Sequence, residues 1–290
     1  MAKKPKKHFF RMLSRIVYLF FFKPDNCAEF VGKSYDRISP GYDDAWTEHM
    51  RNLTEALINE LHPDFGDIAI DFTCGTGFAA NLIAQRTKTK VIGVDKSRGM
   101  LDRARINYGS TCDFINADVL EYLRTLPDSS YDIITCCWGL GYSKPFAVLK
   151  QIKRILKPGG KAGIIDNSLF SLREIIYCSF LTFMEQPEKL VNLMRFRFLM
   201  GKWQLGLWFR LLGFKPTCLS SGNKTYKVLT GQSAIERLTA TGAAAGFEYA
   251  AAPDNKEQIF KRFAEIIEEK YLKKDGIAIT HRYLVGIAQK

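Results

Sequence analysis

The chain has 290 residues, of which 47% are hydrophobic and 25% are charged, so it is long enough to bury a core and too apolar to be disordered. Its seven cysteines form no Cys-x-x-Cys pair, which argues against a disulfide scaffold or a zinc ribbon and indicates reduced thiols in a cytosolic protein. The net charge of +12 is concentrated in residues 1–23 and 169–215, so an anionic partner is expected to bind there.

Residues 1–23 combine seven basic residues with an uninterrupted apolar run at 16–22. That run is too short to span a membrane, and no small-residue cleavage site follows it. On a helix, the basic and apolar side chains fall on separate faces: Lys7, Arg11 and Arg15 against Phe10, Leu13, Val17 and Phe20. The pattern is typical of a helix lying in an anionic membrane surface, and equally of one packed on the protein with its basic face solvated.

From residue 67 onward, short apolar runs alternate with helical patterns, which is typical of a Rossmann-like, doubly wound α/β sheet. The predicted strands are 67–71, 90–95, 112–115, 131–137 and 161–166, with two more at 247–251 and 281–288. The predicted helices are 78–86, 97–107, 145–157, 232–245 and 255–274. These elements together predict a seven-stranded sheet.

Residues 169–215 interrupt this order with a segment too long for a connection and too aromatic for a linker. Its longest charge-free run, residues 175–184, cannot span a membrane. We expect a helical cap over the end of the sheet. Its aromatic side chains would either extend the core or line an apolar pocket.

Acidic residues follow three successive predicted strands, at Asp71, Asp95 and Asp118. Because the carboxyl ends of parallel strands meet at one edge of a sheet, these side chains are expected to share one crevice. Gly75 and Gly77 follow the first strand, where glycine lets the backbone approach a ligand closely and a helix N-terminus presents its N–H groups.

The glycine loop, with Asp95 twenty residues after Gly75, also fits a dinucleotide fingerprint. Asp71 favours a different ligand, because a carboxylate directly before the loop would repel a pyrophosphate but would accept hydrogen bonds from the ammonium of an amino-acid tail. An amino-acid tail, a ribose and an adenine together describe S-adenosylmethionine.

With these motifs, residues 30–168 resemble the class I S-adenosylmethionine-dependent methyltransferases, and most closely their ubiquinone/menaquinone-biosynthesis-like branch. Residues 35–43 (YDRISPGYD) are similar to the tyrosine-rich segment of that branch, and LKPGG at 156–160 precedes the fifth strand. The resemblance implies a mostly parallel sheet with an antiparallel last strand, S-adenosylmethionine as the cofactor and no metal. Thr73 departs from the pattern, since many members have their first glycine there.

Carried over by position, the resemblance gives each motif residue a role. Asp71, Gly75 and Gly77 would line the methionine and ribose part of the cofactor, and Asp95 would bind the ribose hydroxyls. The remaining members of the cofactor-binding set are Lys96, Met100 near the adenine, Asp118 at its amino group, Cys136, and Tyr35 closing the site. The implied organisation is an N-terminal helix and lid (1–44), a cofactor-binding core (45–168), the cap (169–215) and the rest of the core (216–290).

The catalytic group is harder to identify. Methyl transfer needs a general base only where the acceptor must lose a proton. His49, Tyr142 and His281 are candidates, and His49 and Tyr142 are retained as the predicted catalytic pair. The CCWGLGY sequence at 136–142 lacks the Asn/Asp-Pro-Pro-aromatic turn of nucleobase and amide methylases, which argues against that chemistry.

The main hypothesis is therefore a methyltransferase acting on an apolar or amphiphilic small molecule, quinone-like, phenolic or lipid. It would be a cytoplasmic enzyme, peripheral on the inner face of the membrane and bound to anionic lipid through residues 1–23. The alternatives are a phospholipid N-methyltransferase, an RNA methyltransferase, an NAD-dependent oxidoreductase and a non-catalytic member of the fold. Basic charge alone is weak support for RNA, and no RNA-binding module is recognisable. The sequence does not define the oligomeric state.

Overall fold

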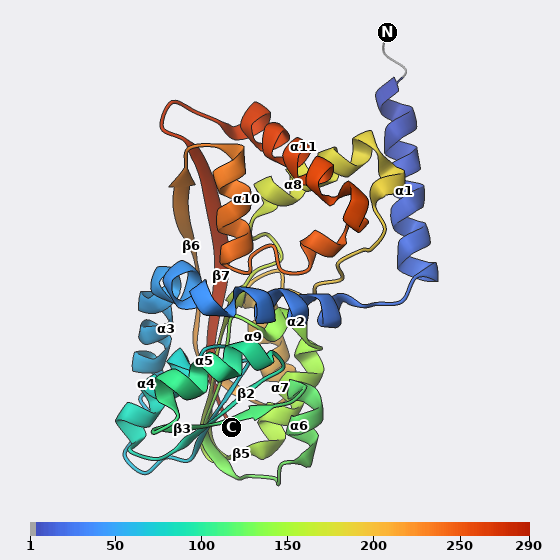
Figure 1. Cartoon of the computed structure of the whole chain (residues 1–290). Coiled ribbons are helices and arrows are strands. Elements are labelled where there is room, and N and C mark those ends of the chain that lie inside the picture. Colours follow the sequence, from blue (N-terminus) through green and yellow to red (C-terminus); the bar gives the residue numbers. More distant parts are fainter. Residues whose placement is uncertain (1–3) are drawn as a thin grey trace. The chain divides into compact units, whose positions relative to one another are not determined.

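The structure is a computed structural model that describes residues 4–290, with side chains from His8 onward, so that Lys3 and the side chain of Lys7 lie outside the described part. The chain divides into two compact units (Figure 1). The helical unit contains the chain up to Ser34, Leu172–Arg195 and Lys224–His281. The sheet unit contains Tyr35–Ser171, Phe196–Asn223 and Arg282–Lys290.

Seven strands form one sheet in the order β3-β2-β1-β4-β5-β7-β6. Their bounds are β1 (Ala69–Phe72), β2 (Val91–Asp95), β3 (Cys112–Asn116), β4 (Tyr131–Cys137), β5 (Leu156–Asn167), β6 (Lys215–Val228) and β7 (Ile277–Gln289). The pairs among β1 to β5 are parallel, and β7 runs antiparallel to β5. This confirms the predicted seven-stranded, mostly parallel sheet with an antiparallel last strand.

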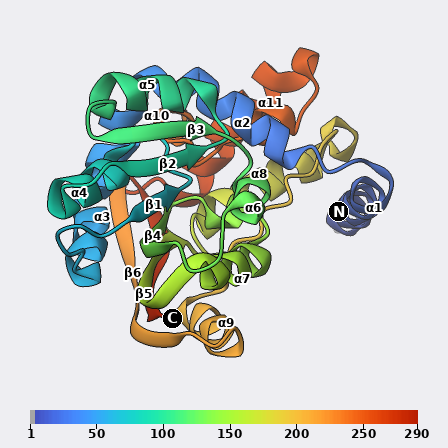
Figure 2. The same ribbon diagram turned by 90° about the horizontal axis from the view of Figure 1, so that it is seen from below.

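Helices cover both faces of the central strands (Figure 2). On one face, Ile70 and Phe72 of β1 join a core formed with α6 (Val119–Thr125), α7 (Pro145–Ile155) and α9 (Lys202–Leu211). On the other face, Ala69 joins a core formed with α3 (Glu48–Leu61) and α4 (Phe78–Thr87). Because side chains alternate along a strand, Asp71 lies on the α3 and α4 face. The carboxylate is therefore buried between the sheet and two helices.

One predicted strand is wrong. Residues 247–251 do not pair in the sheet: Phe247–Tyr249 is a short 3-10 helix, and Phe247 packs in the helical unit against Phe183 and Phe263. The seventh strand is instead β6, at the edge of the sheet. None of its residues is buried, and it contains Pro216 and Gly222, so it shows no apolar alternation from which a strand could be predicted.

The helical unit is built from α1 (Lys4–Phe22), most of α2 (Cys27–Ile38), α8 (Arg173–Glu185), α10 (Gly231–Ala240) and α11 (Pro253–Tyr271). The predicted cap of residues 169–215 forms two helices, α8 and α9, which belong to different units. The four-part organisation expected from the sequence remains a prediction.

The N-terminal helix α1 packs on the helical unit through Met12, Ile16 and Leu19. Its basic side chains also contact the protein: Arg11 pairs with Glu188, and Arg15 donates a hydrogen bond to a backbone carbonyl. The apolar side chains expected to share the other face are all exposed, namely Phe10, Leu13, Val17 and Phe20. Within residues 4–290, no helix is both long enough and apolar enough to cross a membrane.

Candidate functional site

The turn between β1 and α4 carries the glycine loop. Gly75 and Gly77 have φ values of +54° and +87°, in the left-handed region that glycine adopts without strain. A Cβ on Gly77 would lie 2.8 Å from the ring of Phe114, whereas one on Gly75 would meet nothing within 4 Å. Gly77 is therefore fixed by internal packing, and the space beside Gly75 is open to a ligand.

Asp71 is fully buried directly before this loop. Its Oδ1 accepts a hydrogen bond of 2.6 Å from Thr135, its partner in the register of β4. Its Oδ2 has no hydrogen-bond partner among the described residues. Burial raises the pKa of Asp71 to about 7, against the opposing effects of the Thr135 hydrogen bond and of the nearby Ala80 backbone N–H, which does not reach hydrogen-bond geometry. A buried carboxylate oxygen without a donor is costly, and an incoming cation or N–H group would satisfy it.

Asp95, at the end of β2, connects two loops at the same edge of the sheet. Its carboxylate accepts hydrogen bonds of 2.9 Å from the backbone N–H groups of Gly75 and Ser97. Burial raises the pKa of Asp95, and these two backbone hydrogen bonds act in the opposite direction. Asp95 thus holds the glycine loop against the N-terminus of α5 (Arg98–Tyr108).

Residues 35–43, the lid segment, are tied to both cofactor-side loops by their two aspartates. Asp36 accepts hydrogen bonds from the Ser97 hydroxyl at 2.6 Å and from the Gly99 N–H at 3.0 Å. Asp43 accepts from the hydroxyl of Thr76 in the glycine loop and from the amide of Asn107. Each Tyr-Asp pair of the segment therefore contributes one carboxylate that ties the predicted lid to the glycine loop or to the start of α5.

The tyrosines of these pairs form an aromatic cluster with Tyr142. The Tyr35 ring lies 5.9 Å from the rings of both Tyr42 and Tyr142, and the Tyr35 and Tyr142 hydroxyls are 3.3 Å apart. Phe196 and Phe198 extend the cluster, with ring centroids 5.5 and 5.3 Å from that of Tyr142. Burial raises the pKa values of Tyr35 and Tyr42 well above 10, so both phenols stay neutral at physiological pH.

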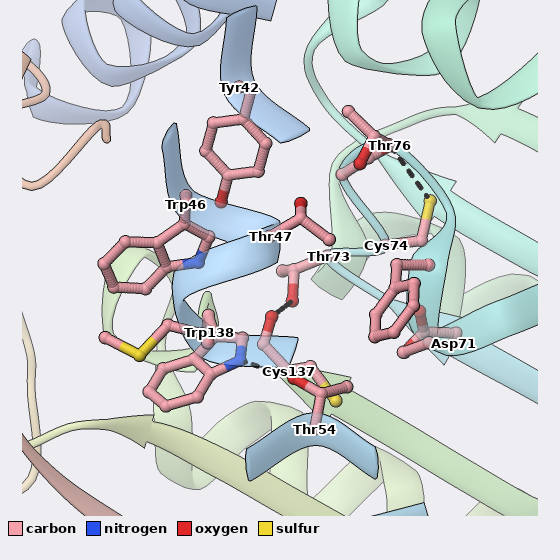
Figure 3. A pocket seen from close by; sticks show the side chains of 14 residues that line it. Tyr42, Trp46, Thr47, Thr54, Asp71, Thr73, Cys74, Thr76, Cys137 and Trp138 are labelled. Carbon is pink, nitrogen blue, oxygen red and sulfur yellow. Dashed lines mark hydrogen bonds between the residues drawn. The ribbon is translucent and has the colours of Figure 1, made fainter. Parts of the chain in front are cut away.

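A pocket lies beside the glycine loop (Figure 3). The indoles of Trp46 and Trp138 stand on one side of it, and Asp71 lies on the other. The two indoles meet edge to face with centroids 5.5 Å apart, and Trp138 Nε1 donates a hydrogen bond to Thr54. The remaining lining comes from the glycine loop, from α3 and α4, from Tyr42 and Thr47 before α3, and from Cys137 of β4. The pocket is therefore apolar on one wall and acidic on the other.

The strand ends around the pocket approach closely because small residues face each other there. A Cβ on Gly139 would lie 2.5 Å from the Cβ of Thr73, so only glycine fits at position 139. Thr73 itself has a φ of +58°, which is unusual for a β-branched residue. The threonine that replaces the family's usual glycine thus sits where glycine would be unstrained.

The other predicted cofactor residues differ in burial and in their hydrogen bonds. Asp118 caps α6, accepting hydrogen bonds from the N–H groups of Leu120 and Glu121 through one oxygen. Met100 is buried in the first turn of α5, while Lys96 is exposed. Cys136 is buried at the end of β4, 3.4 Å from the Thr73 hydroxyl. Their roles toward a cofactor remain predictions.

The candidate bases are not brought together. Tyr142 lies in the aromatic cluster, whereas His49 of α3 does not line the pocket even though its neighbours Trp46 and Met50 do. His281 is fully buried in β7, with its ring near that of Tyr226 in the helical unit. Their catalytic roles remain predictions, and the aromatic setting of Tyr142 is the one nearest the lid.

Several residues of the site were not predicted to belong to it, among them Asp166, which the sequence indicated only as a strand-end residue. Asp166, at the end of β5, is fully buried and accepts hydrogen bonds of 2.7 Å from the N–H groups of Gly141 and Asn167, which fixes the turn carrying Tyr142. Burial raises the pKa of Asp166 to about 7. No sequence motif identified the aromatic residues of the site, namely Trp46, Trp138, Phe196 and Phe198. Asp36 and Asp43 belonged to a recognised segment, but nothing in the sequence indicated that they anchor it.

The residues present fit S-adenosylmethionine. Asp71 offers an unpartnered carboxylate oxygen to an ammonium, the space beside Gly75 is open, and Asp95 lies at the end of the neighbouring strand. Within residues 4–290, no group of three or more His, Cys, Asp or Glu side chains could hold a metal ion.

Residues 69–160 match the family described as a methyltransferase domain. The chain is 33% identical over 152 residues to the 2-phytyl-1,4-naphtoquinone methyltransferase of Synechococcus elongatus, covering 46% of this chain and 61% of that protein. It is 34% identical to the demethylmenaquinone methyltransferase of Lactobacillus johnsonii, covering 46% and 59%. The matched region thus spans about three fifths of these relatives.

Among solved structures, the YcgJ protein of Bacillus subtilis is similar in fold, with a TM-score of 0.59 and 15% identity over 83% of this chain and 98% of that one. The match of residues 69–160, together with the fold and the site, supports a class I S-adenosylmethionine-dependent methyltransferase domain that takes S-adenosylmethionine as its cofactor. The matched region is similar to methyltransferases of the quinone-biosynthesis branch, which the sequence also resembles.

Proposed function

We propose that this protein transfers a methyl group from S-adenosylmethionine to an apolar or amphiphilic small molecule, with a quinone-like or phenolic acceptor as the first choice. The observation that carries the proposal is the buried Asp71, whose Oδ2 lacks a hydrogen-bond partner within the described part of the chain, directly beside an open glycine loop. An ammonium satisfies that oxygen. The pyrophosphate of a dinucleotide would place like charge against it, which disfavours the oxidoreductase alternative.

The bound cofactor supplies a methyl group already activated on a positively charged sulfur. The chain therefore has to orient the acceptor in line with that methyl and exclude water. Asp71 binds the ammonium end and Asp95 the ribose hydroxyls, which fixes the donor at two points. The lid, anchored by Asp36 and Asp43, places Tyr35 and Tyr42 over this edge.

The acceptor would bind against the cluster of Tyr142, Phe196 and Phe198. Flat aromatic faces suit a quinone or phenol ring, and the Tyr142 hydroxyl can hydrogen-bond an acceptor oxygen. The two relatives, a naphthoquinone and a menaquinone methyltransferase, support this substrate class. Carbon or oxygen methylation of a ring follows as the preferred reaction, with N-methylation of a phospholipid headgroup second.

Calorimetry with S-adenosylmethionine and with NAD, followed by mass spectrometry of quinol and phenol acceptors incubated with the donor, tests this proposal. We expect heat of binding only with S-adenosylmethionine, and an acceptor mass increased by one methyl group. Phe198→Ala should raise KM for the acceptor about tenfold while leaving donor affinity unchanged, because it removes a ring that packs on Tyr142 and leaves Asp71 and Asp95 in place. Binding of NAD in place of the donor would contradict the proposal.

The exposed apolar side chains of α1 support a peripheral position on the inner membrane face. Deleting residues 1–23 would uncover the core that Leu19 buries, so point changes are the sharper test. Phe10→Ser, Val17→Ser and Phe21→Ser together should weaken binding to anionic vesicles about tenfold, because each removes an exposed apolar group from the interface. Leu229→Ser with Leu272→Ser, also exposed in the helical unit, is the matched control for co-sedimentation. Equal loss in both variants would rule out α1 as the anchor.

A further inference from the structure

The helix α9 of the sheet unit is apolar on two sides. One side is buried, with Leu205 and Phe209 in the core. On another, Trp203, Leu207 and Leu211 recur every fourth residue and are 60%, 46% and 67% exposed. A helix held in place by one apolar face normally shows a polar face to water. The row on α9 therefore exposes apolar side chains where a surface helix would present polar ones.

The row continues to the edge of the sheet that carries the site. Leu169 and Phe170 follow the end of β5, and both are exposed. A hydrogen bond of 2.7 Å from the Leu169 N–H to the Leu199 carbonyl brings them beside Met200, which is also exposed and leads into α9. We call these six residues the α9 surface: Leu169, Phe170, Met200, Trp203, Leu207 and Leu211. Exposed apolar surface of this extent marks an interaction site.

The same short stretch of chain reaches the aromatic cluster. The Arg197 N–H donates a hydrogen bond of 2.8 Å to the Gly141 carbonyl, and a Cβ on Gly141 would lie 2.1 Å from the ring of Phe198. Phe196 and Phe198 pack on Tyr142, and Met200 of the α9 surface follows Phe198 closely in the chain. The surface adjoins the side of the site assigned above to the acceptor.

The two chain segments that contain α9 and pack against it carry charges of one sign. Residues 144–157 and 196–215 contain nine Lys and Arg residues and no Asp or Glu. These two segments are packed together, with the rings of Phe146 and Trp208 5.4 Å apart. Five exposed basic side chains there make no ion pair with any residue in 4–290: Lys144, Lys150, Lys202, Arg210 and Lys215. Apolar side chains with a basic surround complement an anionic lipid bilayer.

We propose that the α9 surface docks on an anionic membrane, with Trp203, Leu207 and Leu211 at the lipid interface. This contact is separate from α1 and belongs to the unit that carries the site, and its role in admitting an amphiphilic acceptor rests on the proposed function. RNA would use the basic residues but has no need of an exposed row of leucines. The row therefore favours lipid over nucleic acid.

Tryptophan fluorescence of the full chain with phosphatidylcholine/phosphatidylglycerol vesicles, brominated on their acyl chains, tests the proposal. Residues 4–22 contain no Trp, so α1 alone cannot produce quenching. We expect quenching that Trp203→Phe largely removes, and about tenfold weaker vesicle binding for Leu207→Ser with Leu211→Ser. Phe65→Ser with Ile106→Ser is the matched control, because these side chains are 84% and 74% exposed in the same unit outside the α9 surface. It should bind vesicles as the unaltered chain does.

Three results would overturn the proposal. Quenching that persists undiminished in Trp203→Phe would show that Trp203 does not lie at the lipid interface. A solution dimer that the double serine variant converts to monomers would make the α9 surface a self-interface. Salt-sensitive RNA binding lost in Lys202→Gln with Arg210→Gln, with vesicle binding unchanged, would identify a nucleic-acid site. The vesicle readout needs no methyl donor, so its failure is distinguishable from failure of the proposed methyl transfer.

Discussion

Asp71→Asn is expected to weaken S-adenosylmethionine binding by roughly 30-fold or more, about 2 kcal/mol, because it removes the charge that the donor's ammonium would neutralise in a buried site. Asparagine keeps an oxygen for the Thr135 hydroxyl, so the strand pairing around it should survive. Isothermal calorimetry measures the loss directly. An unchanged affinity would show that Asp71 does not contact the donor.

The pH dependence gives an independent readout of the same residue. The pKa of Asp71 rises from 3.8 to about 7 on folding, so the native state holds its proton more tightly than the unfolded state. This contribution to stability is full below about pH 4 and is lost as the pH rises through 7, by roughly 4 kcal/mol at most. Donor binding needs the ionised form and should strengthen over the upper part of that range.

The comparison with Asp71→Asn isolates this effect from other titrating groups. The variant should lose the pH dependence of donor affinity between about pH 6 and 8, and it should unfold at a higher denaturant concentration than the unaltered protein at pH 8. Asp166 has the same direction of shift and is retained in both proteins. Parallel affinity profiles for the two proteins would contradict the assignment.

Asp95→Ala is expected to lower donor affinity about 100-fold, roughly 3 kcal/mol, since it removes the ribose ligand and the acceptor that orders the glycine loop. Asp95→Asn should lose less, because an amide oxygen can still accept from the Gly75 N–H. Calorimetry and a thermal shift on adding donor would measure both changes.

Asp132→Ala is the matched control for this prediction. Asp132 also accepts a backbone hydrogen bond, from Ile68, and pairs with Lys157 at 2.6 Å, but it lies at the start of β4, away from the site. It should lose stability and keep its donor affinity. If Asp95→Ala and Asp132→Ala bind the donor equally well, the strand-end carboxylates do not form the cofactor site.

The alternation of short apolar strands with helices was sufficient to predict the central sheet, because a strand buried on both faces must be apolar along its length. The edge strand β6 was missed for the opposite reason. With none of its residues buried, its sequence carries no apolar signal, and its place depends on hydrogen bonds to β7. Residues 247–251 were apolar enough for a strand but pack against helices instead.

By itself, the sequence determined which carboxylates and glycines lie at the carboxyl edge of the sheet. Parallel strands end on the same side, and local motifs indicate where each strand ends. Only the tertiary structure decided what surrounds them. Asp43 reaches Thr76, Trp46 meets Trp138 and Phe198 meets Tyr142 across long stretches of chain. Such contacts depend on the packing of several elements at once, and no local pattern of residues encodes them.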